Sequence, residues 1–321
     1  MKKILIVICS VFLVACSKSS NALKEIAKNI NNSNSYYLEG TLEVMNGDDS
    51  SFYNVKVSYK KDNLFKVSLT NQINNHEQII LRNTDGVYVL TPSIGKSFKF
   101  QSDWPYNNSQ IYLLQTLLND INNNEYTYKE TNDEYTYTTN VTYSNDKNLV
   151  KQDIIFGKDY KIKSVLVYDK NESIKMKMIF KTVDMNKNYD SSYFTLEENM
   201  KSSKMEESTA NLKDIVYPMY VPSDTYLTNK ETIDTSNGKR VILTFTGNKP
   251  FTFIQENVSL TNVTLLIDGD FVLLNDVIGN VSENEVSWIS NGIEYYITSD
   301  VLSKQEMIEI ASSVGLLAVS K

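Results

Sequence analysis

Cysteine, histidine and glycine are scarce in this 321-residue sequence, which contains two, one and 11 of them respectively. The single histidine, His76, leaves the usual zinc-binding sets short of ligands, and any catalytic triad would depend on it alone. No Gly-rich phosphate-binding loop occurs, and no spacing singles out the pair of carboxylates that glycan hydrolysis requires. The sequence therefore predicts a protein that is not an enzyme and that uses no cofactor and no metal.

Basic residues are outnumbered by acidic ones. The chain has 32 Lys and Arg against 39 Asp and Glu, a net charge of −7, and it lacks basic clusters, which argues against nucleic-acid binding. Asp268-Gly269-Asp270 and Asn46-Gly47-Asp48-Asp49 resemble calcium loops faintly, but hairpin turns are favoured because further ligands are missing. His76 lies in the polar loop NQINNHEQ, where a solvated turn residue is expected.

A long apolar run occurs only at the N-terminus. Residues 4–15 (ILIVICSVFLVA) follow two lysines; they are too short for a membrane-spanning helix, which needs about 20 residues, but they fit a signal peptide. The run ends in Leu13-Val14-Ala15-Cys16, which resembles the bacterial lipobox, where the cysteine thiol accepts diacylglycerol. We expect residues 1–15 to be a lipoprotein signal peptide and residues 16–20 a lipidated tether. Cys16 would then anchor the protein at the extracytoplasmic face of the cell membrane.

The mature chain is predicted to be mostly β. Alternating apolar and polar residues before Phe194 predict about ten antiparallel strands with one apolar face. Two amphipathic helices are expected, one beginning near Ser20 and one over residues 109–121. Residues 197–210 have few apolar side chains and are interpreted as a linker. A first domain over residues 21–196 is thus separated from a second unit over residues 211–321.

The second unit has its own strand, turn and helix signals. Asn291-Gly292 predicts a hairpin turn, and Ser303 to Glu306 forms a capping box that opens a final helix. Residues 16–205 hold 23 acidic and 23 basic residues, whereas residues 206–321 hold 16 and seven. Because anionic headgroups repel an acidic unit, we expect the second unit to point away from the membrane.

Trp104 stands out among the aromatic residues because it precedes Pro105 in a loop between a predicted strand and the second helix. One interpretation is a packing anchor for that helix. The other is an exposed partner contact or a lid at a cleft mouth, since tryptophan is a frequent interaction hot spot. The second interpretation predicts a binding surface made of Trp104, Phe98, Phe100, Leu114 and Leu117.

Residues 78–121 (QIILRNTDGVYVLTPSIGKSFKFQSDWPYNNSQIYLLQTLLNDI) resemble lipoproteins of endospore-forming bacteria that share the LolA/LolB carrier fold. This group of lipoprotein-sorting or sporulation lipoproteins includes the germination lipoprotein GerS, and the resemblance extends over residues 20–196. Residues 286–315 resemble a small domain of unknown function, DUF4367. The resemblance implies an α+β, mostly β fold, in which a bent antiparallel half-barrel is closed by helices around an apolar cleft, plus a small C-terminal α+β unit.

The resemblance leaves two functions open. One is a non-enzymatic scaffold that binds a protein partner in the cell envelope, such as an enzyme of spore peptidoglycan, during sporulation or germination. The other is a carrier or sensor of acyl chains, from a lipid or a lipoprotein, held in the cleft. An open apolar cavity would favour the carrier, whereas a filled cleft with an exposed aromatic patch would favour the scaffold.

Replacing Cys16 tests the membrane anchor. Cys16→Ala removes the thiol that accepts diacylglycerol, so the protein should be released to the medium or accumulate as uncut precursor. Cell fractionation after labelling with palmitate measures both the location and the lipid. A variant that still sediments with membranes and carries the label would contradict the assignment of Cys16.

Overall fold

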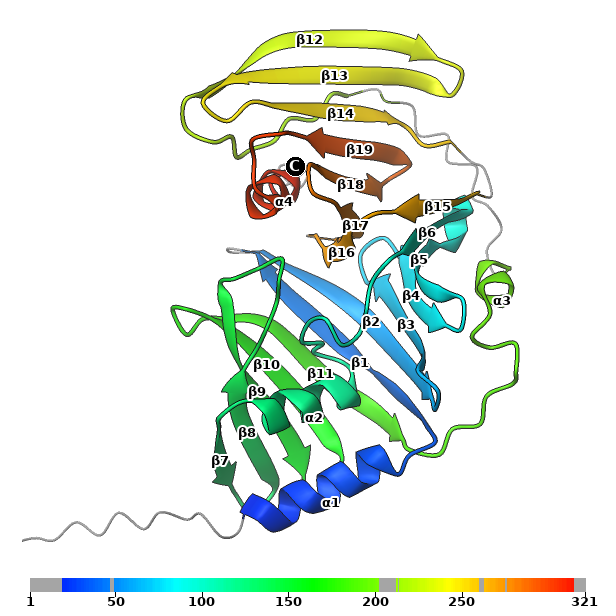
Figure 1. Ribbon diagram of the computed structural model, residues 1–321, viewed down its shortest axis with the longest axis vertical. Coiled ribbons are helices and arrows are strands. Elements are labelled where there is room, and N and C mark those ends of the chain that lie inside the picture. Colours follow the sequence, from blue (N-terminus) through cyan, green and yellow to red (C-terminus); the bar gives the residue numbers. More distant parts are fainter. Residues whose placement is uncertain are drawn as a thin grey trace, which may run out of the picture.

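The computed structural model describes residues 19–46, 49–201, 212, 214–259, 263–274 and 276–314. The predicted signal peptide, Cys16 and most of the predicted linker lie outside the described residues. Figure 1 shows an elongated molecule, with a curved sheet and two helices in its lower part and a second sheet at the opposite end from helix α1 (Ser19–Asn31).

The large sheet has 12 strands, and the first eleven strands of the chain all belong to it. Their neighbouring pairs are all antiparallel. In spatial order the strands are β15 (Val263–Ile267), β6 (Lys96–Phe100), β5 (Gly86–Thr91), β4 (Glu77–Asn83), β3 (Leu64–Asn71), β2 (Asp49–Lys60), β1 (Ser35–Asn46), β11 (Ile174–Asp184), β10 (Ile162–Asp169), β9 (Leu149–Gly157), β8 (Glu134–Asn140) and β7 (Tyr126–Glu130). The predicted half-barrel is confirmed.

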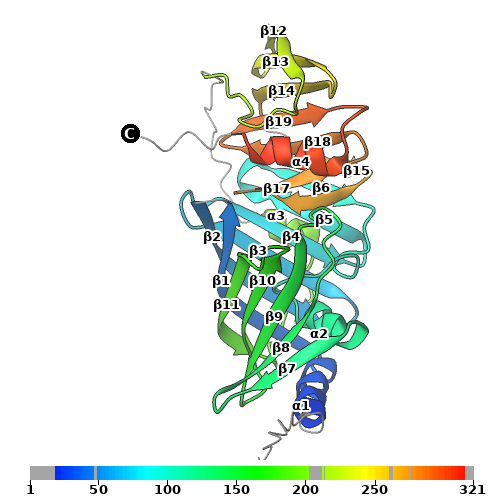
Figure 2. The same ribbon diagram turned by 90° about the vertical axis from the view of Figure 1, so that its left-hand side faces the viewer.

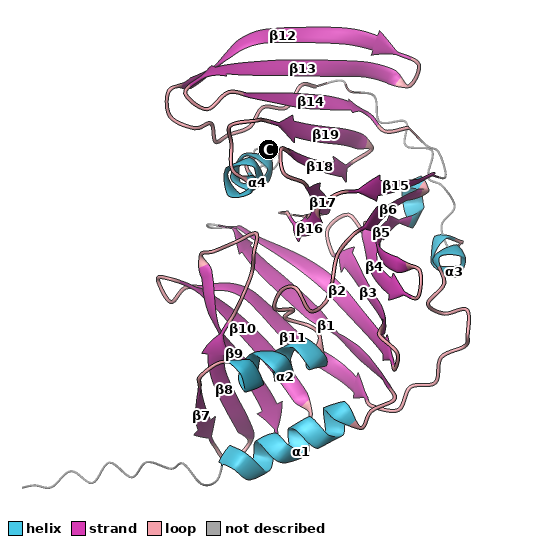
Figure 3. Ribbon diagram, in the orientation of Figure 1, coloured by secondary structure: helices cyan, strands magenta, loops and turns pink. Residues whose placement is uncertain are grey.

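The concave face of this half-barrel holds the main core. Ile26 and Ile30 of α1 and Leu117 and Ile121 of α2 (Leu114–Asn123) pack there, each at most 4% exposed. Figure 3 shows both helices on the same side of the sheet. A short 3-10 turn, Pro92–Ile94, connects β5 to β6.

Helix α2 begins five residues later than the sequence predicts. The backbone N–H of Ser109 donates to the Thr142 carbonyl at 2.8 Å, and the Thr142 N–H donates to Ser109 Oγ at 2.9 Å. These bonds hold residue 109 against the loop after β8, so the chain becomes helical only at Leu114.

The pairing of β1 with β11 is irregular at Gly40. The register shifts between Glu39 and Gly40, and a Cβ atom on Gly40 would lie 2.1 Å from the Ile179 carbonyl oxygen. Only glycine allows this close approach of two backbones. The extra residue is Lys181 of β11, and because a bulge bends its strand, this position contributes to the curvature of the large sheet.

The second sheet has seven strands and is covered by α4 (Lys304–Ser312). In Figures 1 and 2, α4 lies at the level of β18 (Glu285–Ser290) and β19 (Ile293–Thr298), and it contacts both strands. The Ser303 capping box is present, and Asn291 and Gly292 both have positive φ in the β18–β19 hairpin, as predicted. In spatial order the strands are β12 (Thr225–Thr235), β13 (Gly238–Gly247), β14 (Phe251–Asn257), β19 (Ile293–Thr298), β18 (Glu285–Ser290), β17 (Ile278–Val281) and β16 (Asp270–Leu273).

A segment before the second unit covers part of the convex face of the half-barrel. Phe194 packs with Leu81 and Tyr88 in a separate apolar cluster. Helix α3 (Leu196–Met200) follows and occupies the first residues of the predicted linker.

The two units share a sheet and a set of buried polar contacts. Strand β15 pairs in parallel with β6. Gln78 of β4 bonds the backbone of Ile278 of β17 twice, since Gln78 Oε1 accepts from Ile278 N at 2.6 Å and Gln78 Nε2 donates to Ile278 O at 3.1 Å. Lys96 Nζ of β6 lies 3.8 Å from Glu294 Oε2 of β19, and both side chains are buried.

The ion pair between Lys96 and Glu294 should stabilise the junction. Glu294→Ala leaves the Lys96 ammonium buried without its partner, which typically costs about 3–5 kcal/mol. Glu283→Ala is the matched control, because the Glu283 side chain is 91% exposed in its pair with Lys304. Urea unfolding measures both variants, and equal losses of stability would contradict a special role for the buried pair.

Candidate functional site

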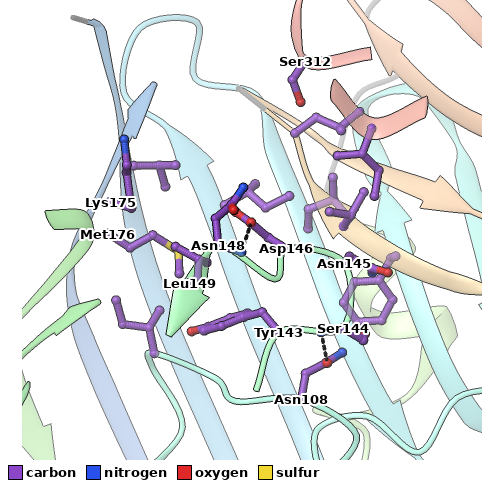
Figure 4. Close-up of a pocket in the computed structure, with 18 of the residues that line it drawn as sticks. Asn108, Tyr143, Ser144, Asn145, Asp146, Asn148, Leu149, Lys175, Met176 and Ser312 are labelled. Atoms are coloured by element: carbon purple, nitrogen blue, oxygen red, sulfur yellow. Dashed lines mark hydrogen bonds between the residues drawn. The ribbon is translucent and has the colours of Figure 1, made fainter. Parts of the chain in front are cut away.

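A cavity of about 930 Å³ lies where the half-barrel meets the second unit. Strands of the large sheet, two loops over residues 108–112 and 143–149, and parts of β16 and α4 line it. In Figure 4, Ser312 of α4 lies across the cavity from Tyr143 and Asn108. The volume falls in the range of roughly 300–1,000 Å³ that is typical of small-molecule sites.

The floor of the cavity is apolar. Leu42 and Val44 of β1, Leu69 of β3, Ile80 of β4 and Met176 of β11 line it. Because alternate residues of a strand point to the same side, these side chains continue the concave face that packs against α1 and α2. Leu42, Leu69 and Ile80 are buried, whereas Val44 and Met176 are half-buried, so the floor is open to the cavity mainly at β1 and β11.

Two loops tied to each other form one wall. Besides the Ser109–Thr142 bonds, the Ser144 N–H donates to Asn108 Oδ1 at 2.8 Å, as Figure 4 shows. Ile111 and Tyr143 line the cavity from these loops. The wall is thus held by three hydrogen bonds from backbone N–H groups, two of which go to side-chain oxygens, and it carries both apolar and polar side chains.

The second unit supplies the roof. Phe271 and Leu273 of β16 and Ile308 of α4 line the cavity. Asp270 joins the roof to the half-barrel, since its Oδ2 accepts from Asn107 Nδ2 at 2.7 Å. Neither unit alone forms the cavity.

Charges of both signs surround the cavity. Asp146, Asp169, Lys170 and Lys175 are among the lining residues, and Lys175 Nζ lies 3.5 Å from Asp169 Oδ2. Hydrogen bonding from the Ser173 backbone, with smaller help from Lys175, lowers the pKa of Asp169. The polar side chains therefore combine with an apolar floor, a distribution suited to an amphipathic ligand.

Trp104 is buried, with 1% of its surface exposed, so the expectation of an exposed tryptophan is wrong. Its ring packs against Phe65 of β3 and Phe271 of β16, with ring centroids 5.9 and 6.1 Å away. Arg82 donates a hydrogen bond to the Trp104 carbonyl. Trp104 is an anchor between the two units, and it also lines the cavity.

The other four predicted binding residues lie in the hydrophobic core. None of them is among the residues that line the cavity, because β6 and α2 direct these side chains into the packed part of the concave face. Their exposed fractions are 6% for Phe98, 3% for Phe100, 2% for Leu114 and 0% for Leu117.

Sequence reasoning missed the lining residues Tyr143, Phe271 and Ile308. Tyr143 lies in a polar loop without a motif, and Phe271 and Ile308 are far along the chain from the half-barrel. Only the tertiary contact between the two units brings them to the cavity, so no local signal could have found them.

His76 is not the solvated turn residue that the sequence predicts. It lies between β3 and β4, is partly buried, and its Nε2 has no hydrogen-bond partner among the described residues. Burial lowers its pKa, and Asp276 of the second unit acts in the opposite direction. The approach of the second unit explains the burial.

Neither a metal site nor a membrane-spanning helix is present in the part of the chain that the structure describes. No three His, Cys, Asp or Glu side chains gather there in a way that could hold a metal ion. Asp270, from the faintly calcium-like turn, accepts hydrogen bonds from Asn107 and from the Phe271 N–H. None of the described helices has the length and apolar character to cross a membrane.

Comparisons with known proteins point to one family. The family model for YdcC-like sporulation proteins matches residues 1–194. Sporulation protein YdcC of Bacillus subtilis (strain 168) is 36% identical over 290 residues, which cover 87% of this chain and 85% of that protein.

Likenesses to solved structures are more remote. The complex of the CwlD amidase from Clostridioides difficile with the GerS lipoprotein gives 17% identity and a TM-score of 0.28, over 59% of this chain and 99% of the matched chain. The LolA superfamily protein NE2245 from Nitrosomonas europaea is 11% identical with a TM-score of 0.32, and the match covers 55% of this chain and 98% of that protein. A chain of the MucA/MucB complex of Pseudomonas aeruginosa is 12% identical with a TM-score of 0.33, and the match covers 92% of this chain and 98% of that one.

Asp120 of α2, behind the loop wall, should make stability depend on pH. Burial raises the pKa of its carboxyl from 3.8 to about 6, although hydrogen bonds from Ser109 and Gln152 act to lower it. A carboxyl with a higher pKa in the folded state binds protons more readily there, so its contribution to stability falls as the pH rises through this range. Asp120→Asn removes the charge and should therefore stabilise the protein more at pH 8 than at pH 4, by up to about 3 kcal/mol.

Urea unfolding at the two pH values measures this difference between Asp120→Asn and the unmodified protein. Asp133→Asn, in an exposed turn, is the matched control for the loss of one charge. The same stability difference at pH 4 and pH 8 would show that Asp120 does not titrate as the burial requires.

Proposed function

The chain belongs to the family of YdcC-like sporulation proteins, and from this membership we propose that it is a non-enzymatic binding protein acting in sporulation. Its binding site is the cavity between the half-barrel and the second unit. The ligand is an apolar chain, such as an acyl chain of a membrane lipid or of another lipoprotein.

The observation that carries this proposal is the apolar floor beneath an unfilled volume of about 930 Å³. Val44 of β1 and Met176 of β11, which are half-buried, carry the part of this floor that solvent still reaches. Covering such surface with a hydrocarbon removes it from water, which contributes roughly 25 cal/mol per Å². A ligand with a long apolar part is therefore favoured over a polar one.

The lipobox supports a location on the outer face of the cell membrane. Only residues 17 and 18 separate Cys16 from α1, and α1 lies at the end of the molecule opposite the second sheet (Figure 1). A diacylated Cys16 would thus hold the half-barrel against the membrane. The acidic second unit would extend away from the anionic headgroups.

A protein partner is the second candidate, and exposed side chains after the linker favour it. Tyr217, Met219 and Tyr220 are 42%, 56% and 43% exposed. Their segment is held in place, because the Met219 N–H donates to the Ser313 carbonyl and Gln255 bonds both backbone groups of Val216. A fixed apolar strip of this kind suits binding of an envelope enzyme.

Native mass spectrometry separates the two candidates. The lipidated protein is released from membranes of sporulating cells with detergent and its mass is measured. A co-purifying lipid supports the cavity as the binding site, and a co-purifying protein without lipid supports the scaffold. Protein that carries neither would count against both.

A variant that fills the cavity tests the site itself. Met176→Trp adds a large side chain on the concave face of β11 and should abolish lipid co-purification with little change in melting temperature. Ile179→Trp is the matched control, because Ile179 is 42% exposed on the opposite face of the same strand. Undiminished lipid on the Met176→Trp protein would place the ligand elsewhere.

A further inference from the structure

Three tyrosines form a stack at the end of the half-barrel where α1 lies. Tyr128 of β7, Tyr135 of β8 and Tyr160, in the turn between β9 and β10, are all half-buried. The ring of Tyr135 is stacked on both others, with its centroid 6.3 Å from that of Tyr128 and 5.9 Å from that of Tyr160. Figures 1 and 2 show β7 and β9 ending at the same end of the molecule as α1. The tyrosine stack therefore belongs to the end that carries the predicted tether.

Tyr160 has a backbone conformation that is unusual for its residue type. Its φ of 62° lies in the left-handed region, which a bulky residue rarely adopts. The Tyr160 N–H donates to the Gly157 carbonyl, and the Gly157 N–H donates to the Lys161 carbonyl, so the turn is a three-residue hairpin loop. Glycine fits the left-handed position of such a loop without strain. Because the backbone of this turn does not favour a tyrosine, its side chain is a candidate for a functional role.

Tyr160 also lies beside helix α1. The neighbouring Tyr135, and to a smaller extent burial and Glu25 of α1, raise the pKa of the Tyr160 hydroxyl. Only residues 17 and 18 separate Cys16 from α1, and three Cα–Cα steps span at most about 11 Å. A diacylated Cys16 would therefore bring the surface around the first turns of α1, with Tyr160 beside it, to the lipid headgroups.

The charge at this end is close to neutral. Helix α1 and the two turns, residues 129–134 and 158–163, hold six lysines and five acidic residues. Three of these acidic side chains are paired with lysines, namely Glu25 with Lys28, Glu130 with Lys158 and Glu134 with Lys163. Anionic headgroups repel the acidic second unit, whereas this end can approach them.

Tyrosine suits the boundary between lipid and water. Its ring is apolar and its hydroxyl is polar, and tyrosine is enriched at membrane interfaces. We propose that the tyrosine stack is a membrane contact, which rests together with α1 in the headgroup region and fixes the orientation of the half-barrel on the membrane. This inference rests on the lipid anchor of the proposed function and specifies which residues touch the membrane.

Quenching of a fluorescent label by lipid headgroups tests the contact. The sequence holds only Cys9 and Cys16, so an introduced cysteine is the one free thiol once the signal peptide is removed and Cys16 is lipidated. Asn132→Cys puts the label in the exposed β7–β8 turn, and Ser236→Cys puts it in the exposed β12–β13 turn of the second sheet. The lipidated protein is reconstituted into phosphatidylcholine vesicles that contain a lipid with a nitroxide on its headgroup. The label at residue 132 should be quenched, and the label at residue 236 should not.

Tyr160→Gly tests the role of the tyrosine side chain. Glycine suits the left-handed backbone, so the melting temperature should change little. Loss of one tyrosine from the interface should shift the equilibrium between contacting and free orientations roughly three- to tenfold, which lowers the quenching at residue 132. Tyr226→Ser is the matched control, because Tyr226 is 65% exposed on β12, in the second sheet, and it should leave the quenching unchanged.

Equal quenching at residues 132 and 236, or undiminished quenching in Tyr160→Gly, would overturn the inference. Either result leaves the cavity proposal intact, because none of the three tyrosines is among the residues that line the cavity and lipid co-purification tests that site separately. Protein that does not associate with the vesicles would show that the anchor is missing, and the inference would fail with it.

Discussion

The parallel pairing of β15 with β6 is the contact on which the rest of the architecture depends. Strands β14 and β16, which precede and follow β15 in the chain, both belong to the second sheet, so β15 crosses to the half-barrel and returns. Only residues 268 and 269 separate β15 from β16. This short connection keeps β16 beside the half-barrel, where Phe271 contacts Phe100 with ring centroids 5.3 Å apart and the roof of the cavity begins.

Directional contacts then fix how the roof lies over the floor. Apolar burial has no preferred direction, and two apolar surfaces alone would allow many arrangements. The paired hydrogen bonds of Gln78 with Ile278 and the ion pair of Lys96 with Glu294 are satisfied in only one of them. Because buried polar groups are costly when unpaired, shifted arrangements are disfavoured. The dimensions of the cavity are therefore set at the junction, where Ile278 both bonds Gln78 and lines the cavity.

Local sequence signals predicted the local structure well. Period-two alternation predicted the strands of the half-barrel, Asn291-Gly292 a hairpin turn, and Ser303 with Glu306 a capping box, because each depends on residues close in the chain. The start of α2 was missed because Ser109 bonds Thr142, 33 residues away. The burial of His76 was missed for the same kind of reason, since Asp276 of the second unit lies close to it. The two interpretations of Trp104 could not be separated from the sequence, because Phe271, which packs against its ring, also belongs to the second unit.

The cavity itself follows from a mismatch of lengths that alternation cannot reveal. Strand β1 has 12 residues, which span about 40 Å at the usual rise. Helices α1 and α2 both lie across the strands (Figure 1) and cover about 20 Å, at roughly 10 Å each. Leu38 and Val44 occupy the same face of β1, yet Leu38 lies in the packed core and Val44 lines the cavity. The combined breadth of the two helices is thus about half the length of the strands that they cross. The other half of the concave face is covered by the second unit, which closes over it but leaves the cavity between them.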